Sequence, residues 1–367
     1  MAKMYHYFLK VHFDSNGLRK EPRSQLLISN LPIMQTVAID AAPGDRESMA
    51  RLLHNFTVAA LVFVVYKLWT RRSPSDISER GPSCANSTQI SLKPQKLFSA
   101  QSLCVGEKLK ECVPPFVSFR QQYRFSKKYS LLGCAIEKNF STFLTAILCF
   151  LHDEEGFQKN NRTLDREIFH HRLCAKQNEA TSMSEMGNRN WTLLAVIRDP
   201  VERFVSGFVD KCLREQTWKA HRERCNGCRT NLTCFVEVEY SRMMHYTKHR
   251  RHVSFDDDHF FPQSWRCEFA SSMSKYHLLK LNAEKPAAFF DALVDLLQRS
   301  HVSDASIEFI DVSLRSKRTR HSTVNSPERT AVLREIRGSR RLTSRLVQMY
   351  FYDFVLFGFP LPQIPAT

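Results

Sequence analysis

The segments EKNFST (residues 137–142) and RDPVERFVS (residues 198–206) decide the fold of this chain. An apolar run precedes each of them. Residues 129–136 (YSLLGCAI) are short and compatible with a strand, and residues 191–197 (WTLLAVI) have the composition of a buried strand. We therefore expect two strands of one sheet, each ending in a polar loop.

Each loop is followed by the start of a helix. Apolar residues recur at helical spacing after residue 142, and Pro200 suits the first turn of a helix. A helix N-terminus favours phosphate or sulfate, because its N–H groups are unpaired and its dipole end is positive. Lys138, Ser141 and Thr142 would add charge and donors to the first site. Two such sites suit a ligand with anionic groups at both ends.

Together the two segments resemble the two cofactor-binding motifs of the Golgi carbohydrate sulfotransferases, which use 3′-phosphoadenosine-5′-phosphosulfate (PAPS). Within that superfamily the chain most resembles the nematode branch related to chondroitin sulfotransferases. The most specific match is the string Arg-Asp-Pro-x-x-Arg-x-x-Ser-x-Phe, which starts at Arg198. Further matching segments are residues 206–212 (SGFVDKC), 259–267 (HFFPQSWRC), 321–323 (HST) and 350–359 (YFYDFVLFGF).

This resemblance implies an α/β fold, the P-loop-like sulfotransferase fold, with a central parallel sheet flanked by helices. We expect the catalytic domain over residues 126–362 and a stem or linker over residues 71–125. A single signal-anchor or transmembrane segment is expected over residues 52–70, after an N-terminal extension or cytoplasmic tail over residues 1–51.

The implied function is transfer of the sulfuryl group from PAPS to a glycan hydroxyl, with a chondroitin-like glycosaminoglycan as acceptor. Lys138, Asn139, Ser141 and Thr142 are expected to bind the 5′-phosphosulfate together with the loop amides. The 3′-phosphate is expected to contact Arg198 and Ser206, with Arg203 as an additional contact. No metal is expected.

The acceptor hydroxyl needs a general base. His259 is the first choice, because it lies in a family-like segment after three aspartates, residues 256–258, which would raise its pKa. His171 is the second choice. Residues 321–323 either close over the cofactor or form a plain loop.

Phe140 departs from the family pattern, since relatives commonly carry glycine there. Glycine would permit a positive φ or a close approach of phosphate. Either the loop keeps a negative φ, or cofactor binding is impaired. The second possibility keeps an alternative open, a catalytically silent, membrane-anchored protein that binds polyanions on a sulfotransferase scaffold. A P-loop kinase is the other alternative, and the lack of a Gly-x-x-x-x-Gly-Lys-Ser/Thr string in the chain argues against it.

The chain carries a formal charge of +16, and residues 315–345 hold ten arginines and lysines against two glutamates. Such a stretch attracts an anionic glycan, and its alternative interpretation is a solvated helix face. We expect no nucleic-acid partner, and the sequence does not predict the oligomeric state.

Residues 327–350 are expected to form a helix capped by Ser326, with residues 350–359 as a helix end and strand in the core.

The apolar run 56–65 (FTVAALVFVV) is shorter than a spanning helix, so it is a short signal-anchor or a cleaved signal peptide. Its flanking charges favour a cytosolic C-terminal side. The resemblance implies the opposite, a single-pass type II Golgi membrane protein with a luminal catalytic domain. Because Met49 would make an ordinary start for a signal-anchor, we hypothesise that it is the true initiator.

All eleven cysteines follow this run, as expected in an oxidising lumen. We expect disulfides; a zinc site at Cys225-x-x-Cys228 completed by Cys234 or Cys267 is the alternative. Cys134 and Cys149 are expected to be small buried hydrophobes. Glycosylation sequons begin at Asn86, Asn161, Asn190 and Asn231.

Overall fold

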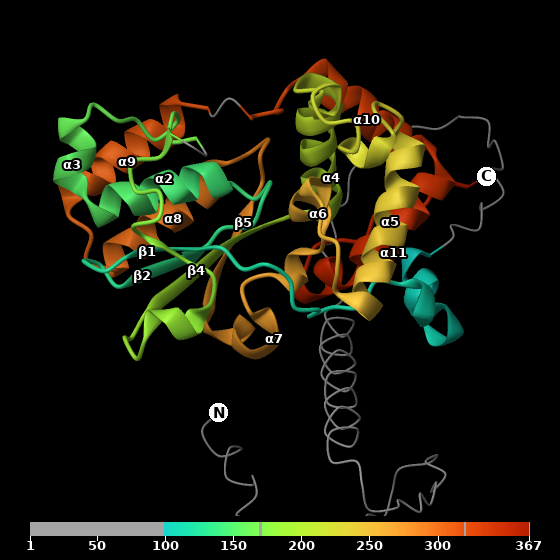
Figure 1. The fold of residues 1–367 in the computed structure, drawn as a ribbon, viewed down its shortest axis with the longest axis horizontal. Coiled ribbons are helices and arrows are strands. Elements are labelled where there is room, and N and C mark those ends of the chain that lie inside the picture. The colour runs from blue at the N-terminus through green and yellow to red at the C-terminus, as the bar shows by residue number, and fades with distance from the viewer. Residues whose placement is uncertain (1–98, 169–170, 319–320, 367) are drawn as a thin grey trace, which may run out of the picture. The chain divides into compact units, whose positions relative to one another are not determined.

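The computed structural model describes residues 99–168, 171–318 and 321–366 of the chain (Figure 1). The predicted tail, the predicted signal-anchor and most of the predicted stem lie outside these residues, as does Cys84. Within the described part of the chain, no helix is long and apolar enough to cross a membrane.

A five-stranded sheet in the order β3-β1-β2-β4-β5 forms the centre of the fold. The parallel part consists of β2 (Leu131–Cys134), β4 (Thr192–Arg198) and β5 (Tyr276–Leu281). At the other side β1 (Tyr123–Ser126) and β3 (Glu179–Ala180) pair antiparallel. The predicted strands before the two loops are thus present and parallel, whereas the expectation of a wholly parallel sheet is wrong at this edge.

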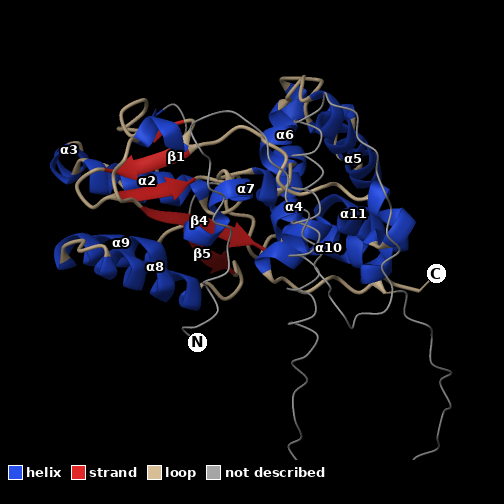
Figure 2. Cartoon of the chain, turned by 90° about the horizontal axis from the view of Figure 1, so that it is seen from below, coloured by secondary structure: helices blue, strands red, loops and turns tan. Residues whose placement is uncertain are grey.

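Alternating residues of β4 divide the core between the two faces of the sheet. Leu194 and Val196 belong to the cluster formed with α2 (Ser141–His152), α8 (Ala287–Arg299) and α9 (Asp304–Ser316). Leu193, Ala195 and Ile197 pack with the cluster on the opposite face. Because side chains alternate along a strand, the apolar residues 193–197 of β4 are buried on both faces of the sheet. Helices α8 and α9 lie along one side of the sheet in Figure 2.

A second group of helices lies at the other end of the described domain, beyond the carboxyl end of β4 (Figure 1). An aromatic cluster from these helices, which includes Phe204, Phe235 and Tyr350, forms their shared core. The group contains α4 (Pro200–Phe208), α5 (Leu232–His249), α6 (Phe255–Phe260), α10 (Pro327–Gly338) and α11 (Arg340–Phe357), while the short helices α3 (Glu154–Lys159) and α7 (Phe269–Ser272) lie by the sheet.

The C-terminal region contains two helices where the sequence predicted one. Ser326 caps α10 as expected, accepting a hydrogen bond from the Arg329 N–H at 3.2 Å. Ser339 then breaks the helix and caps α11. The strand expected after Tyr350 is absent from the described residues, because α11 continues to Phe357. The predicted core role of these aromatic residues is confirmed, since Tyr350, Phe354 and Phe357 are buried.

Five disulfides join the ten cysteines of the described residues. They are Cys104–Cys112, Cys134–Cys267, Cys149–Cys174, Cys212–Cys225 and Cys228–Cys234. The preference for disulfides over zinc is confirmed, because every cysteine of the zinc alternative is in a disulfide. The expectation that Cys134 and Cys149 are merely small hydrophobes is wrong, although both are buried.

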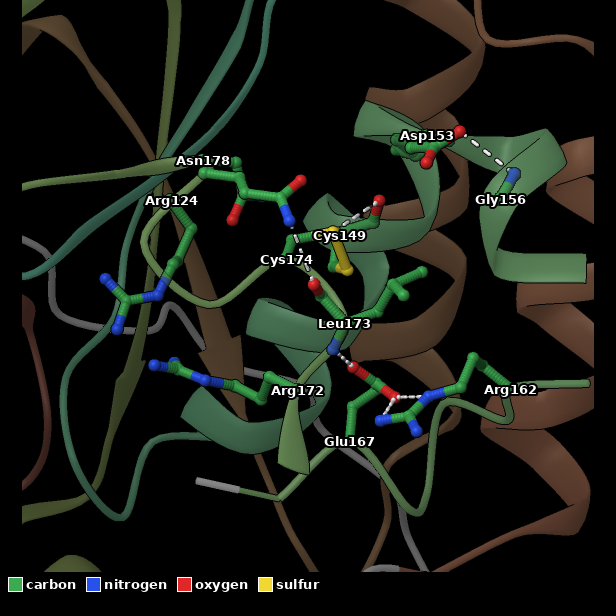
Figure 3. The surroundings of a disulfide bond; sticks show 12 residues. Arg124, Cys149, Asp153, Gly156, Arg162, Glu167, Arg172, Leu173, Cys174 and Asn178 are labelled. Atoms are coloured by element: carbon green, nitrogen blue, oxygen red, sulfur yellow. Dashed lines mark hydrogen bonds and ion pairs between the residues drawn. A yellow bond between two sulfur atoms is a disulfide. The ribbon is translucent and has the colours of Figure 1, made fainter. Parts of the chain in front are cut away.

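The Cys149–Cys174 disulfide fastens the end of α2 to the segment before β3 (Figure 3). Glu167 holds the same segment, because its carboxylate accepts the Leu173 N–H at 2.8 Å and pairs with Arg162. Both ends of α2 are therefore fixed, one by this disulfide and the other by the loop that follows β2.

The Cys134–Cys267 disulfide should contribute more stability than the Cys104–Cys112 disulfide. The sequence separations are 133 and 8 residues. Since a longer closed loop restricts the unfolded chain more, removal should cost about 5 kcal/mol for the first and about 2.5 kcal/mol for the second. Denaturant unfolding of the two paired Cys→Ala variants measures this difference. Equal losses would contradict the entropic explanation.

Candidate functional site

Gln263 joins the two loops that the sequence singled out. Its side-chain amide donates to the Arg198 carbonyl at 2.9 Å, and its side-chain oxygen accepts the Arg198 N–H at 3.0 Å. That oxygen also accepts a hydrogen bond from Asn139, which donates to the Val196 carbonyl at 2.9 Å. Asn139 and Gln263 are fully buried. The first loop is thereby fixed to the end of β4, where the second begins.

The C-terminal helix fixes Gln263 in turn. The Asp353 carboxylate on α11 accepts the Gln263 N–H at 2.7 Å and the Ser264 N–H at 2.9 Å. All three residues are buried. The family-like ending of the chain therefore has a structural reason, because it supplies the carboxylate that holds Gln263.

Arg203, a predicted cofactor contact, ties two segments of backbone together. Its guanidinium donates to the Glu137 carbonyl at 3.0 Å and to the Phe261 carbonyl at 2.9 Å. It is 1% exposed, and burial lowers its pKa. One of its nitrogens, Nη2, has no hydrogen-bond partner among the described residues. Arg203 thus positions the first loop and keeps one donor group free.

Arg198, a predicted cofactor contact, connects the two loops. Its guanidinium donates to the Lys138 carbonyl at 3.2 Å and lies 3.7 Å from the Glu202 carboxylate. Its Nε is buried without a partner in the described part of the structure. Burial lowers the pKa of Arg198 to about 10, so it remains charged at neutral pH. Ser206 is buried one turn beyond Glu202 on α4.

Arg329 adds a further cation beside Glu202. The sequence placed this arginine in the predicted basic patch. It is 3% exposed and pairs with Glu202 and Glu284. Other cations of that patch are also paired: Arg315 with Asp291 and Asp311, and both Arg341 and Arg345 with Glu237. The count of charged residues over 315–345 did not include these carboxylates, because they lie elsewhere in the sequence. The expectation of an unopposed basic patch is therefore wrong for these arginines.

Lys138 reaches a buried ionic cluster on the other side of its loop. Its ammonium group pairs with Asp210, whose carboxylate also lies 3.1 Å from Lys211 and 3.4 Å from His321. Burial and the neighbouring Lys211 lower the pKa of Lys138 to about 8, despite Asp210. Burial alone would raise the pKa of Asp210, but His321 and the two lysines hold it well below its usual range. Since the pKa of Lys138 is still about 8, its ammonium group remains mostly protonated at neutral pH, opposite the ionised Asp210 carboxylate.

His321 connects this cluster to the segment before α10. Its ring lies 2.9 Å from Glu215, and its hydrogen bonds with Asp210 and Glu215 raise its pKa. The ligand atoms of these three residues lie within 4.8 Å of one another, which is a spacing that could hold a metal ion. Because Asp210 already pairs with two lysines, we assign the three residues to ion pairing rather than to metal binding.

His259 lies on α6, near the same cluster. Its Nδ1 is 2.8 Å from the Phe255 carbonyl. We therefore assign the proton to Nδ1, which leaves Nε2 as an acceptor. Burial lowers the pKa of His259 well below 6.5, and the charges of Lys138 and Lys211 lower it further.

The expectation that the three aspartates raise the pKa of His259 is wrong. Asp256 accepts N–H groups of the Cys225–Gly227 turn, Asp257 pairs with Arg242, and Asp258 pairs with Arg120. Their charges are therefore satisfied elsewhere. His171, the second predicted base, is exposed, and its carbonyl accepts a hydrogen bond from Arg162.

The N-terminus of α2 has no side-chain cap, because the N-cap residue is Phe140. Ser141 and Thr142 begin the helix and are half-buried. The first N–H groups of a helix need acceptors from outside it, and an anion can supply them. The uncapped helix and the adjacent Lys138 thus make the first loop suitable for a phosphate or sulfate.

Phe140 has a φ of 65°, so the first of the two alternatives, a loop with a negative φ, is wrong. Its ring stacks on Phe143 at 5.1 Å and meets Phe289 edge-on at 5.0 Å. A left-handed non-glycine residue costs about 1–2 kcal/mol, and aromatic pairs contribute about 0.5–1.5 kcal/mol each. Packing therefore offsets the backbone cost, and the loop adopts the conformation that glycine would favour.

Two linked loops, an uncapped helix beside a lysine and unpaired arginine nitrogens form an arrangement that suits a ligand with separate anionic groups. The sequence model described as the sulfotransferase family matches residues 121–360, and the chain belongs to this family. Among curated proteins of Caenorhabditis elegans, it is 34% identical to carbohydrate sulfotransferase chst-1, over 68% of this chain and 79% of that protein. It is 30% identical to putative sulfotransferase vep-2, over 82% and 88% of the two chains. No solved structure matches the chain.

Replacing Phe140 separates the contributions of its ring and its backbone. Phe140→Ala and Phe140→Gly both remove the ring, so both should unfold at lower denaturant concentration than the native protein. Only glycine relieves the left-handed strain, and Phe140→Gly should therefore be about 1 kcal/mol more stable than Phe140→Ala. A glycine variant more stable than the native protein would show that the ring contributes less than the strain costs.

Proposed function

We propose that this protein is a carbohydrate sulfotransferase that moves the sulfuryl group from PAPS to a glycan hydroxyl, with a chondroitin-like chain as acceptor. The observation that carries the proposal is the buried connection from Lys138 to Arg198 through Asn139 and Gln263. It joins two anion-binding loops in a member of the sulfotransferase family. The name of the relative chst-1 and the positive charge of the chain support a carbohydrate acceptor with acidic groups.

The residues present fit PAPS. The uncapped start of α2 offers N–H groups, and Arg198 Nε and Arg203 Nη2 are buried donors without partners in the described residues. When bound, PAPS supplies an activated sulfonate. Lys138, Ser141, Thr142 and the loop amides would hold its 5′-phosphosulfate, while Arg198 and Ser206 would hold its 3′-phosphate. Asp210 keeps Lys138 oriented and ionised, so that its positive charge stabilises the sulfonate and the leaving phosphate.

His259 is the base that we propose for the acceptor hydroxyl. Its low pKa keeps the imidazole neutral, and the bond between its Nδ1 and the Phe255 carbonyl leaves Nε2 ready to accept a proton. His171 fits this role less well, because it is exposed and lies before β3.

We place the catalytic domain in the Golgi lumen, attached to the membrane as a type II protein through residues 52–70. The five disulfides support an oxidising compartment. This location would also expose the glycosylation sequons to the luminal machinery.

The test is transfer of radiolabelled sulfate from PAPS to desulfated glycosaminoglycans by the chain from residue 73 onward. We expect labelling of a chondroitin-like acceptor, and Lys138→Ala should lower turnover at least about 100-fold, because it removes a charge that stabilises the transferred group. Calorimetry with adenosine 3′,5′-bisphosphate accompanies the assay. Absence of both transfer and binding would support the silent scaffold instead.

His259→Ala should lower turnover by about 10²–10⁴-fold and leave bisphosphate affinity within about twofold, because general-base catalysis makes this contribution to rate. His171→Ala is the matched variant and should retain turnover. Since the pKa of His259 lies below 6.5, the acid limb of kcat/KM in the native enzyme should also lie below pH 6.5. Loss of turnover in His171→Ala alone would assign the base to His171.

A further inference from the structure

The end of α5 carries a dense group of exposed cations, which we call the α5 cationic segment, residues 245–252 (HYTKHRRH). Its basic side chains and imidazoles are all exposed. Lys248, Arg250 and Arg251 have no ion pair within the described residues, in contrast to Arg315, Arg341 and Arg345. No acidic residue occurs between Arg242 and Ser254. The segment therefore keeps its positive charge where other arginines of the chain are neutralised.

A surface groove of about 540 Å³ runs along this segment. Arg242, His245, Arg251 and His252 line it, and the only carboxylates in its lining are Glu237 and Asp257. Both carboxylates are already neutralised: Glu237 pairs with Arg341 and Arg345 at 2.8 and 2.9 Å, and Asp257 pairs with Arg242 at 2.6 Å. Arg251 is thus left as the lining cation without a carboxylate partner among the described residues, with the imidazoles of His245 and His252 beside it.

The helix dipole does not explain the whole segment. Cations in the last turn of a helix gain roughly 0.3–1 kcal/mol, which accounts for Lys248 and His249. Arg250 and His252 lie beyond the helix at positive φ of 51° and 61°, where glycine would be the less strained residue. Basic side chains thus occupy two positions where glycine would be the less strained residue.

We propose that the α5 cationic segment and its groove bind an acidic polysaccharide chain at a distance from the transfer site. This inference rests on the proposed function for the identity of the chain. A polysaccharide fits better than a membrane, because Val238 is the only large hydrophobic residue that is both exposed and in the groove lining, among the residues described. The disulfides argue for an oxidising compartment, where nucleic acid is not the expected polyanion.

Helix α6 contributes one residue to the groove and another to the candidate active site. Asp257 lines the groove, whereas His259, two residues later, lies near Lys138 and Lys211. Two residues correspond to about 200° of rotation on an α-helix, so these side chains lie on nearly opposite sides of α6. Helix α6 packs beside α5 (Figure 1). A long acceptor chain that crosses α6 would contact both surfaces, and a short oligosaccharide would reach only one.

The test compares two variants that each lose three positive charges. Lys248→Gln/Arg250→Gln/Arg251→Gln removes them from the segment. Arg318→Gln/Arg334→Gln/Arg337→Gln removes exposed cations from the predicted basic patch instead. Binding of polymeric chondroitin sulfate is measured without donor over a range of salt concentrations. We expect the first variant to lose about tenfold or more in affinity with a shallower salt dependence, and the second to stay within about twofold.

Three outcomes would overturn the proposal: equal losses in both variants, no loss in the first variant, or loss of binding only to phosphatidylserine vesicles. Transfer to polymeric and tetrasaccharide chondroitin is measured in parallel, and the first variant should lose activity on the polymer alone. Because binding needs no turnover, failure of transfer with intact segment-dependent binding would refute the proposed function and leave the polysaccharide site standing. Unfolding curves confirm that both variants are folded.

Discussion

The site depends on one buried side chain, Gln263, which continues the hydrogen bonding of β4 where the strand ends. A backbone N–H and carbonyl at this position would otherwise be buried without partners, at a cost of about 1–3 kcal/mol each. Gln263 pairs with both groups of Arg198 and also accepts from Asn139. Since Asp353 fixes the Gln263 backbone, four segments distant in sequence meet at one point. The geometry of both anion-binding loops follows from this connection.

The charged residues near the two loops form two groups of ion pairs. In one, Glu202 lies near Arg198 and Arg329; in the other, Asp210 pairs with Lys138 and Lys211. Each group holds a second carboxylate, because Arg329 also pairs with Glu284 and Lys211 also pairs with Glu215. Several members of both groups are buried, where a charge without a partner would be unfavourable. These ion pairs therefore hold the cations in place beside the two loops.

The sequence predicted the parts of the fold that local patterns determine. The strands before the two loops and the cap at Ser326 follow from neighbouring residues, and disulfides were expected because the cysteines all follow the apolar run. The antiparallel edge and the break at Ser339 were missed, because tertiary packing decides them. In the candidate site, Lys138 and Arg198 were proposed from the two loop motifs and their family resemblance. Gln263, Asp210 and Arg329 were missed as a group, because only the fold brings their partners together.

Phe140 shows why the loop has to be considered together with its surroundings. The sequence alone makes a bulky residue at a glycine position look like damage. In the structure the ring joins the aromatic cluster between α2 and α8, and the backbone still takes the left-handed conformation. A side chain that packs here also holds the first turn of α2 against α8. The substitution thus exchanges conformational freedom for packing, while the N–H groups of α2 remain without a side-chain cap.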